Sequence, residues 1–391
     1  MRSNISGLDS SKCSGCGLCV NICPKNLISL QKDELGFIRP VVDNSRCLEC
    51  GLCLKQCIIV SPMPAVQPIE TYAAVRQDKE KIGKSSSGGI FAALAECALS
   101  KGWMVAGCIL DDKQNPCHTL TTDKTLVEKM YGSKYVQSDI VSVYEDVLFS
   151  LQRGHHVLFS GTPCQIAAIK RYTKNHENLI TAEVICHGVP NKEMFLSYLN
   201  MYDLVNIKKF EFRDKSQGWS FNNLFVYKNG KLKRLNHRLS SYMTYFLEGE
   251  IYRDSCYECP YAKPERVADI TLGDFWGVVG QRPDLKKVID IEKGVSCLLV
   301  NTSKGAELIN HSGIEKFEVI YSTIQHGNGP LNHPSRHTLK RAAILGKWAT
   351  NRDWSDVHGY WKRNDYRLSY LFWSKIPTKL QHKIRLLLGK R

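Results

Sequence analysis

The sequence predicts two units of different fold class, an α+β unit at the N-terminus and a larger α/β unit with a mixed, mainly parallel sheet. Eight cysteines occupy the first sixty residues in two near-copies of one pattern, and a proline-stiffened stretch follows at residues 61–68. Beyond it, strand-like and helix-like segments alternate, which favours parallel strands joined by helices. We therefore expect units at residues 1–62 and 69–330, and a basic, aromatic C-terminal tail at residues 331–391.

The cysteine pattern predicts two 4Fe-4S clusters. Three thiolates at intervals of three residues wrap one turn of chain around a cubane, whereas a fourth, four residues further on, ligates the other cluster. The ligand sets expected for clusters one and two are, respectively, Cys13, Cys16, Cys19 and Cys57, and Cys47, Cys50, Cys53 and Cys23. This spacing is that of a bacterial two-cluster ferredoxin, so the first unit is predicted to carry single electrons.

Other uses of these cysteines are disfavoured. A zinc site takes four ligands, usually as two close pairs, and would leave cysteines over. A disulfide framework is not needed by a chain that can bury a large core, and no secretory signal peptide opens the sequence. One departure from the pattern is Ile58, which stands where Pro24 follows the first run.

Composition indicates a globular protein of the cytoplasm. The hydrophobic fraction is 43%, the 16 cysteines suit a reducing compartment, and no stretch approaches the roughly 18 apolar residues that span a bilayer. The net charge is +15, and residues 331–391 hold 14 Lys or Arg against 3 Asp, which leaves +4 for the rest. This tail, which closes with the basic and apolar run at residues 379–388, predicts a helical tail packed by its aromatic residues. The alternative is a peripheral contact with the inner membrane surface or an acidic partner. Nucleic acid is not expected, because no groove-reading motif accompanies the charge.

The second unit begins with a predicted strand at residues 71–75, a helix at 90–99 and a strand at 103–110. A βαβ pattern then follows at residues 157–160, 165–172 and 180–185, and shorter alternating strands such as 224–227 and 296–301 come later.

Four further cysteines predict a third 4Fe-4S cluster. Thr162 and Pro163 are typical of a helix start, so Cys164 is expected at a helix N-terminus, where the dipole favours a thiolate. Cys186 follows the next predicted strand, and parallel neighbouring strands bring both sulfurs to the carboxyl edge of the sheet. The pair Cys256 and Cys259 completes a tetrathiolate set, for which zinc remains an alternative. No role is expected for the lone residues Cys97, Cys108, Cys117 and Cys297.

Six motifs in order resemble the beta subunit of the coenzyme F(420) hydrogenases and dehydrogenases, over the chain up to about residue 330. They are Ser86-Ser87-Gly88-Gly89, Gly132-Ser133-Lys134-Tyr135-Val136, Gly161-Thr162-Pro163-Cys164-Gln165, Cys186-His187-Gly188-Val189-Pro190, Cys256-x2-Cys259 and the run from Ala268 to Gly277. The resemblance implies a flavin, FAD rather than FMN, and a reductase reaction with a deazaflavin or another two-electron partner.

Flavin contacts are expected at two motifs. A serine- and glycine-rich loop that opens a helix, with Ser87, Gly88 and Gly89, offers amide groups to phosphate, although a plain turn has the same composition. Lys134 could add charge and Tyr135 could stack on a ring, against the alternatives of an exposed lysine and a core tyrosine.

Three other polar residues have competing interpretations. Asp269 and Asp274 are either polar ligands near the clusters or substrate, or turn residues around Gly273. His187, the one catalytic candidate, is either a proton relay or a hydrogen-bond partner of the adjoining ligand.

The predicted function is that of an iron-sulfur flavoprotein oxidoreductase, which exchanges electrons with a donor such as ferredoxin and hydride with a small organic acceptor, in either direction. The alternative is an electron-transfer subunit with no substrate site of its own, which serves a separate catalytic chain.

Overall fold

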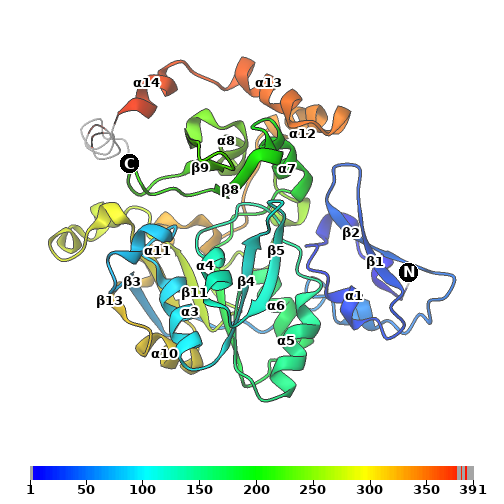
Figure 1. Ribbon diagram of the computed structural model, residues 1–391. Coiled ribbons are helices and arrows are strands. Elements are labelled where there is room, and N and C mark those ends of the chain that lie inside the picture. Colours follow the sequence, from blue (N-terminus) through cyan, green and yellow to red (C-terminus); the bar gives the residue numbers. More distant parts are fainter. Residues whose placement is uncertain (1–2, 377–379, 381–383, 385–391) are drawn as a thin grey trace.

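The computed structural model describes residues 3–376 together with 380 and 384. The large sheet with its helices occupies the centre, the N-terminal unit lies against one side of it, and a second layer built from residues after 190 covers one end (Figure 1). Within the described residues, we find no helix that is both long enough and apolar enough to cross a membrane.

The N-terminal unit is a small α+β fold. An antiparallel pair, β1 (Ile28–Lys32) and β2 (Ile38–Val42), packs with the short helices α1 (Leu18–Ile22) and α2 (Leu52–Lys55). Each helix starts directly after a glycine in the left-handed region, with φ of 75° at Gly17 and 72° at Gly51. Glycine adopts this conformation without strain, which lets the chain turn immediately after Cys16 and Cys50. The turns η1 (Ile5–Gly7) and η2 (Ser10–Lys12) complete the unit.

The large sheet has eight strands in the order β13-β3-β12-β11-β7-β6-β4-β5. The four strands β11, β7, β6 and β4 are parallel, and antiparallel pairings add the strands on both sides. In chain order the strands are β3 (Glu70–Arg76), β4 (Met104–Leu110), β5 (Pro116–Thr121), β6 (Val157–Gly161), β7 (Leu179–Val184), β11 (Ile270–Asp274), β12 (Ser296–Val300) and β13 (Ile314–Glu318). The predicted mixed sheet is thus confirmed, with its parallel strands together at the centre and antiparallel strands on both sides.

Helices cover both faces of the sheet, which buries its apolar side chains on each side. On one face lie α3 (Ile90–Ser100), α4 (Lys124–Met130) and α10 (Ser303–Asn310). On the other, α5 (Val143–Gln152) and α6 (Pro163–Tyr172) cover β5, β6 and β7, and α9 (Val278–Gln281) and α11 (Tyr321–Gly327) cover the end with β3 and β12.

The second layer has an aromatic core that the sequence did not reveal. It contains the sheet β10-β9-β8, with β8 (Ile207–Glu211), β9 (Asn222–Tyr227) and β10 (Leu232–Asn236), and the helices α7 (Lys192–Asn200) and α8 (Ser241–Leu247). The predicted tail contributes α12 (Lys340–Asn351) and α13 (Trp354–Asn364), whose Trp348, Trp354 and Trp361 are buried in this core. These two helices are therefore an integral part of the layer, whereas α14 (Ser369–Lys375) lies on its surface and most of the run at residues 379–388 falls outside the described residues.

Candidate iron-sulfur and flavin site

The four cysteines predicted to hold cluster two line a single cavity. Its wall is formed by residues that follow α1 and by residues directly before and within α2, together with Leu27, Ile28 and Val42. Cys53 is buried and accepts from the amide of Ile5 at 3.2 Å, whereas Cys50 is exposed. Cluster two would therefore lie close to the surface. The four cysteines that line this cavity are Cys23, Cys47, Cys50 and Cys53.

The cluster-one cysteines also lie together. Burial, together with the neighbouring charges of Cys13 and Cys57, raises the pKa of Cys16 to about 12. Burial and the charges of Cys16, Cys13 and Cys57 also raise the pKa of Cys19. These mutual effects show that the thiols lie close together, and a thiol that coordinates a metal loses its proton to it.

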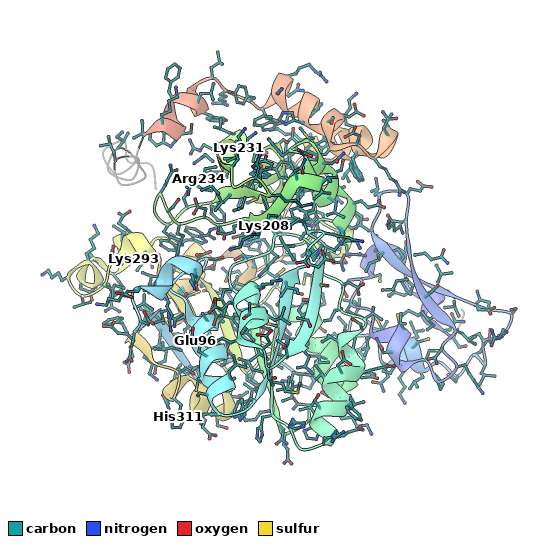
Figure 2. The ribbon with its side chains drawn as sticks, in the orientation of Figure 1. Glu96, Lys208, Lys231, Arg234, Lys293 and His311 are labelled. Carbon is teal, nitrogen blue, oxygen red and sulfur yellow. The ribbon has the colours of Figure 1, made fainter. Side chains whose placement is uncertain are left out.

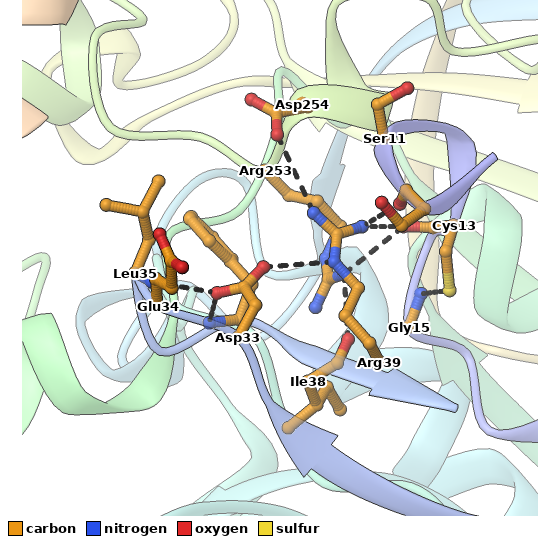
Figure 3. A network of polar contacts seen from close by, with 12 residues as sticks. Ser11, Cys13, Gly15, Asp33, Glu34, Leu35, Ile38, Arg39, Arg253 and Asp254 are labelled. Carbon is orange, nitrogen blue, oxygen red and sulfur yellow. Dashed lines mark hydrogen bonds and ion pairs between the residues drawn. The ribbon is translucent and has the colours of Figure 1, made fainter. Parts of the chain in front are cut away.

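Side chains of the α/β unit hold the main chain around cluster one. Tyr144 donates to the carbonyl of Cys16 at 2.8 Å, and Gln137 donates to the carbonyls of Ser14 and Gly15 at 3.1 and 3.2 Å. Figure 3 shows the part of this network centred on Arg253 and Arg39. The loop that would wrap cluster one is thus fixed against the second unit.

Ile58 strengthens the same contact. It is fully buried among residues of α5 and α6, and Tyr261 donates to its carbonyl at 2.8 Å. The departure from proline at this position therefore serves the packing of the two units.

The four cysteines of the predicted third cluster line one cavity at the carboxyl edge of the sheet. Cys164 lies at the start of α6, where Gln165 accepts from the amide of Thr162 at 3.0 Å. Cys186 follows β7, which pairs in parallel with β6, as the βαβ pattern predicted. The segment that carries Cys256 and Cys259 closes the cavity from the second layer.

Electrostatic interactions agree with this grouping. Burial raises the pKa of Cys186, and the charges of Cys256, Cys164 and Cys259 raise it further. Burial also raises the pKa of Cys256 to about 12. No three His, Cys, Asp or Glu side chains in the described ranges converge tightly enough for one metal ion. A cubane has a different requirement, since each thiolate binds a different iron and the sulfurs surround a space. The tetrathiolate cavity fits such a cluster.

The three cysteine groups are neighbours. The charge of Cys53, in the group predicted for cluster two, raises the pKa of Cys19, in the group predicted for cluster one. The charge of Cys164, in the third group, likewise raises the pKa of Cys16, in the group predicted for cluster one. Ser14 and Ile59 of the N-terminal unit also line the cavity of the third group. The cysteines predicted to hold cluster one therefore lie between those predicted to hold cluster two and the third cysteine group.

Beyond the third cavity, the carboxyl end of β11 carries a compact polar and aromatic group. Asp274 pairs with the buried Arg213 at 3.0 Å and accepts from the indole of Trp219 at 3.0 Å. Trp219 stacks on Trp276 with ring centres 4.9 Å apart, and the Arg213 guanidinium lies 4.2 Å from the ring centre of Phe221. We call these five residues the edge group. His187 lies between this group and the third cavity, since it lines the cavity and is close enough to Asp274 for their charges to interact. Burial lowers the pKa of His187, and the charge of Asp274 opposes this effect.

The serine- and glycine-rich loop lies beside the edge group. Arg213 donates to the carbonyl of Ser86 at 3.0 Å, and Lys215 donates to that of Ser87 at 2.7 Å. The expected phosphate donors are engaged within the protein, because the Gly88 amide donates to the hydroxyl of Ser296 and the Ser87 hydroxyl donates to Val295. Gly89, with φ of 85°, is the N-cap residue of α3.

Two buried polar side chains at this loop lack partners. Arg76, 3% exposed at the end of β3, pairs with Glu96 at 2.8 Å through one nitrogen, while its Nε and Nη1 have no hydrogen-bond partner in the part of the chain described. The buried hydroxyl of Ser85 is also unpaired there. A Cβ on Gly89 would lie 2.8 Å from the Arg76 side chain and 3.5 Å from Ser85 Oγ, so both groups adjoin the N-terminus of α3. Unpaired donors beside a helix N-terminus fit a phosphate group.

The other expected flavin contacts have roles within the protein. The Lys134 ammonium donates to the carbonyls of Lys129, Tyr131 and Gly132 at the end of α4. The Tyr135 hydroxyl accepts from Arg213 at 2.9 Å, which joins it to the edge group.

Of the two aspartates considered from sequence, only Asp274 lies at the candidate site. Asp269 is buried at the start of β11 and accepts from Thr181 and Thr302, which is a structural role. Sequence reasoning missed Arg76, Arg213, Lys215, Trp219 and Trp276 as site residues. The aromatic residues near residue 220 were the one signal in the sequence for this part of the site. The arginines could not be found in this way, because they pair with residues far away in the sequence and form no local pattern.

Comparison with known families agrees with the motifs. Residues 71–145 match the model described as coenzyme F(420) hydrogenase/dehydrogenase, beta subunit N-term, and residues 154–320 match the corresponding C terminus. Residues 12–59 match a 4Fe-4S dicluster domain. No curated protein matches the chain.

One similar solved structure is a xenon derivative of the F(420)-reducing nickel-iron hydrogenase complex from Methanosarcina barkeri. The match covers 78% of this chain and 95% of that chain, with 16% sequence identity and a TM-score of 0.45.

Proposed function

Because the chain belongs to the coenzyme F(420) hydrogenase/dehydrogenase beta subunit family, we propose that it is an iron-sulfur flavoprotein oxidoreductase. Electrons would pass between three 4Fe-4S clusters and a flavin, with hydride moving to or from an organic partner, a deazaflavin coenzyme or a biosynthetic intermediate. The observation that carries this proposal is the single cavity lined by Cys164, Cys186, Cys256 and Cys259 beside the cluster-one cysteines.

The arrangement of the cysteine groups supports a direction along the molecule. Cys50 is exposed, so an external electron carrier such as a ferredoxin would approach cluster two. The third group lies at the sheet edge, where open α/β sheets bind their ligands. Electrons would thus enter or leave at the surface of the N-terminal unit and be used at the sheet edge.

A flavin, when bound, would supply the conversion between single electrons and hydride. Arg76, Ser85 and the N-terminus of α3 are suited to hold its diphosphate, with Lys215 on the other side of the same loop. The Trp219 and Trp276 stack is suited to contact a flat ring close to His187. The diphosphate of FAD matches several cationic groups at one loop better than the single phosphate of FMN does.

His187 and Asp274 would act at the same place. Both face the region between the third cavity and the edge group, where His187 could hold a proton for the acceptor. Ser335 fixes the loop of His187 by donating to its carbonyl at 2.5 Å.

Anaerobic purification of the full chain tests the proposal. We expect about twelve irons and one FAD per chain, since each cubane holds about four irons. Fewer than eight irons together with no bound flavin would refute it.

The description of the family as a beta subunit favours one alternative, an electron-transfer subunit that serves a separate catalytic chain. Isolated protein that oxidises a reduced viologen with an organic acceptor would support the enzyme. Activity that requires a second chain would support the subunit.

A further inference from the structure

Helix α14 carries large apolar side chains on its outer face. Leu368, its N-cap residue in helical conformation, is 71% exposed, Leu371 is 40% exposed and Phe372 is 73% exposed. At 3.6 residues per turn these side chains and Lys375 fall within about 100° of arc. A surface helix of a globular protein ordinarily turns polar residues toward solvent, whereas α14 turns large apolar side chains toward it.

The opposite face of α14 is already used. Tyr370 and Trp373 point toward η5 (His237–Leu239), where the Arg238 guanidinium lies 5.6 and 5.8 Å from their ring centres. The helix is thus held on the second layer by its aromatic side chains. This packing leaves the apolar side chains of the arc exposed to solvent.

Positive charge surrounds the apolar arc. Arg367 precedes the helix, Lys375 ends it, and Lys362 and Arg363 end α13, all of them exposed. The nearby acid Asp365 is engaged, since it pairs with Lys340 at 2.5 Å and accepts from the Tyr245 hydroxyl at 2.8 Å.

The strand that leads to Arg238 also carries positive charge. Figure 2 labels Arg234 on β10 and Lys231 directly before it.

We propose that α14 and its flanking cations form a docking surface for an anionic lipid bilayer, with Leu368, Leu371 and Phe372 entering the headgroup region. Apolar side chains enter the boundary of the acyl chains while lysines and arginines bind anionic headgroups, and the two contributions reinforce each other. An acidic protein would match the charge but would leave two leucines and a phenylalanine without an apolar environment. The docking would hold the oxidoreductase at a membrane surface without a spanning segment.

Sedimentation of the intact protein, purified anaerobically, with lipid vesicles tests this proposal. We expect binding to vesicles of phosphatidylcholine mixed with phosphatidylglycerol, little binding to phosphatidylcholine alone, and loss of binding at high salt. The double variant Leu368→Ser and Phe372→Ser should partition at least about tenfold more weakly, because two large apolar side chains no longer leave water. Lys375→Gln should weaken partitioning by about fivefold.

Ile320→Ser is the matched control, since Ile320 is 72% exposed at the N-cap of α11 in the large α/β unit, and its replacement should leave binding unchanged. Equal binding by the double variant and the unchanged protein would overturn the proposal. So would failure to bind anionic vesicles, including the case in which an acidic protein such as a ferredoxin is bound through the same cations instead.

Discussion

The guanidinium of Arg253 donates to the main-chain carbonyl of Cys13 at 3.2 Å, across 240 residues of sequence (Figure 3). The same side chain donates to the carbonyl of Ile38 at 3.0 Å and to Gln137 Oε1 at 2.7 Å, and it has no exposed surface. Its charge interacts with those of Cys13 and Cys256, so a buried cation lies between the cysteine groups proposed for clusters one and three. Arg253 therefore both joins the two units and places positive charge between two cysteine groups.

Replacement of Arg253 should change the redox properties of cluster one. In Arg253→Gln, we expect a lower reduction potential, because the cation that stabilises the reduced, more negative cluster is gone. Loss of the buried hydrogen bonds should also lower the free energy of unfolding by about 3 kcal/mol. Redox titration followed by electron paramagnetic resonance measures the potential, and chemical denaturation measures the stability.

Arg352→Gln provides the control for this variant. Arg352 also donates to carbonyls of the N-terminal unit, those of Asp33 and Glu34, at 2.8 and 2.7 Å, but it does not adjoin a cysteine group. It should leave the potential unchanged. Equal potentials in Arg253→Gln and the unchanged protein would contradict the electrostatic role.

The third cysteine group should account for one complete cluster. We expect Cys186→Ser to lower the iron content by about four atoms per chain, because a cubane needs its fourth thiolate to remain bound. The signals of the two ferredoxin clusters should persist. Iron analysis and spectra of the reduced protein make this measurement.

Cys297→Ala tests whether any buried cysteine has the same effect. Cys297 is fully buried on β12 and donates to the carbonyl of Asp274, outside the three groups, so its removal should leave iron unchanged. A zinc atom in place of iron at the third site, found by metal analysis of the unchanged protein, would contradict the cluster assignment.

Local sequence signals predicted the parts of the site whose ligands come from short segments. The runs beginning at Cys13 and Cys47 determine their own geometry, and the βαβ pattern was sufficient to bring Cys164 and Cys186 to one edge. The structure places both where that pattern indicated, because parallel neighbouring strands leave no other position for their carboxyl ends.

Contacts between distant segments could not be predicted in the same way. Arg253 and Cys13, or Arg213 and Asp274, are joined by packing between layers, and no periodicity relates them. The tail was predicted to be helical and packed by its aromatic residues, but the sequence did not indicate that Trp348, Trp354 and Trp361 pack with residues of α7, α8 and β9. Burial of that kind becomes visible only when the layers are assembled.

Arg76 should be required to retain a phosphate-bearing flavin. In Arg76→Gln, we expect the dissociation constant for FAD to rise by at least about tenfold, because a charge-assisted hydrogen bond contributes about 1.5–3 kcal/mol. Riboflavin, which has no phosphate, should bind both proteins equally. Quenching of flavin fluorescence measures each affinity. Arg234→Gln serves as the control, because it removes an arginine of β10 that pairs with Asp214. FAD affinity unchanged by Arg76→Gln would exclude the phosphate site.

The affinity for FAD should also depend on pH through Lys215. Burial, together with the charges of Arg213 and Lys293 and against the opposing charge of Asp274, lowers the pKa of Lys215 to about 7. The ammonium form of Lys215, which attracts phosphate, is therefore present below about pH 7 and is lost as the pH rises. Above that pH, Lys215 must take up a proton when FAD binds. We expect FAD affinity to fall by up to about tenfold per pH unit above pH 7. Lys215→Arg should remove this dependence, because arginine stays protonated, and riboflavin should not show it. FAD affinity that is constant between about pH 6 and pH 8 would mean that Lys215 does not contact the phosphates.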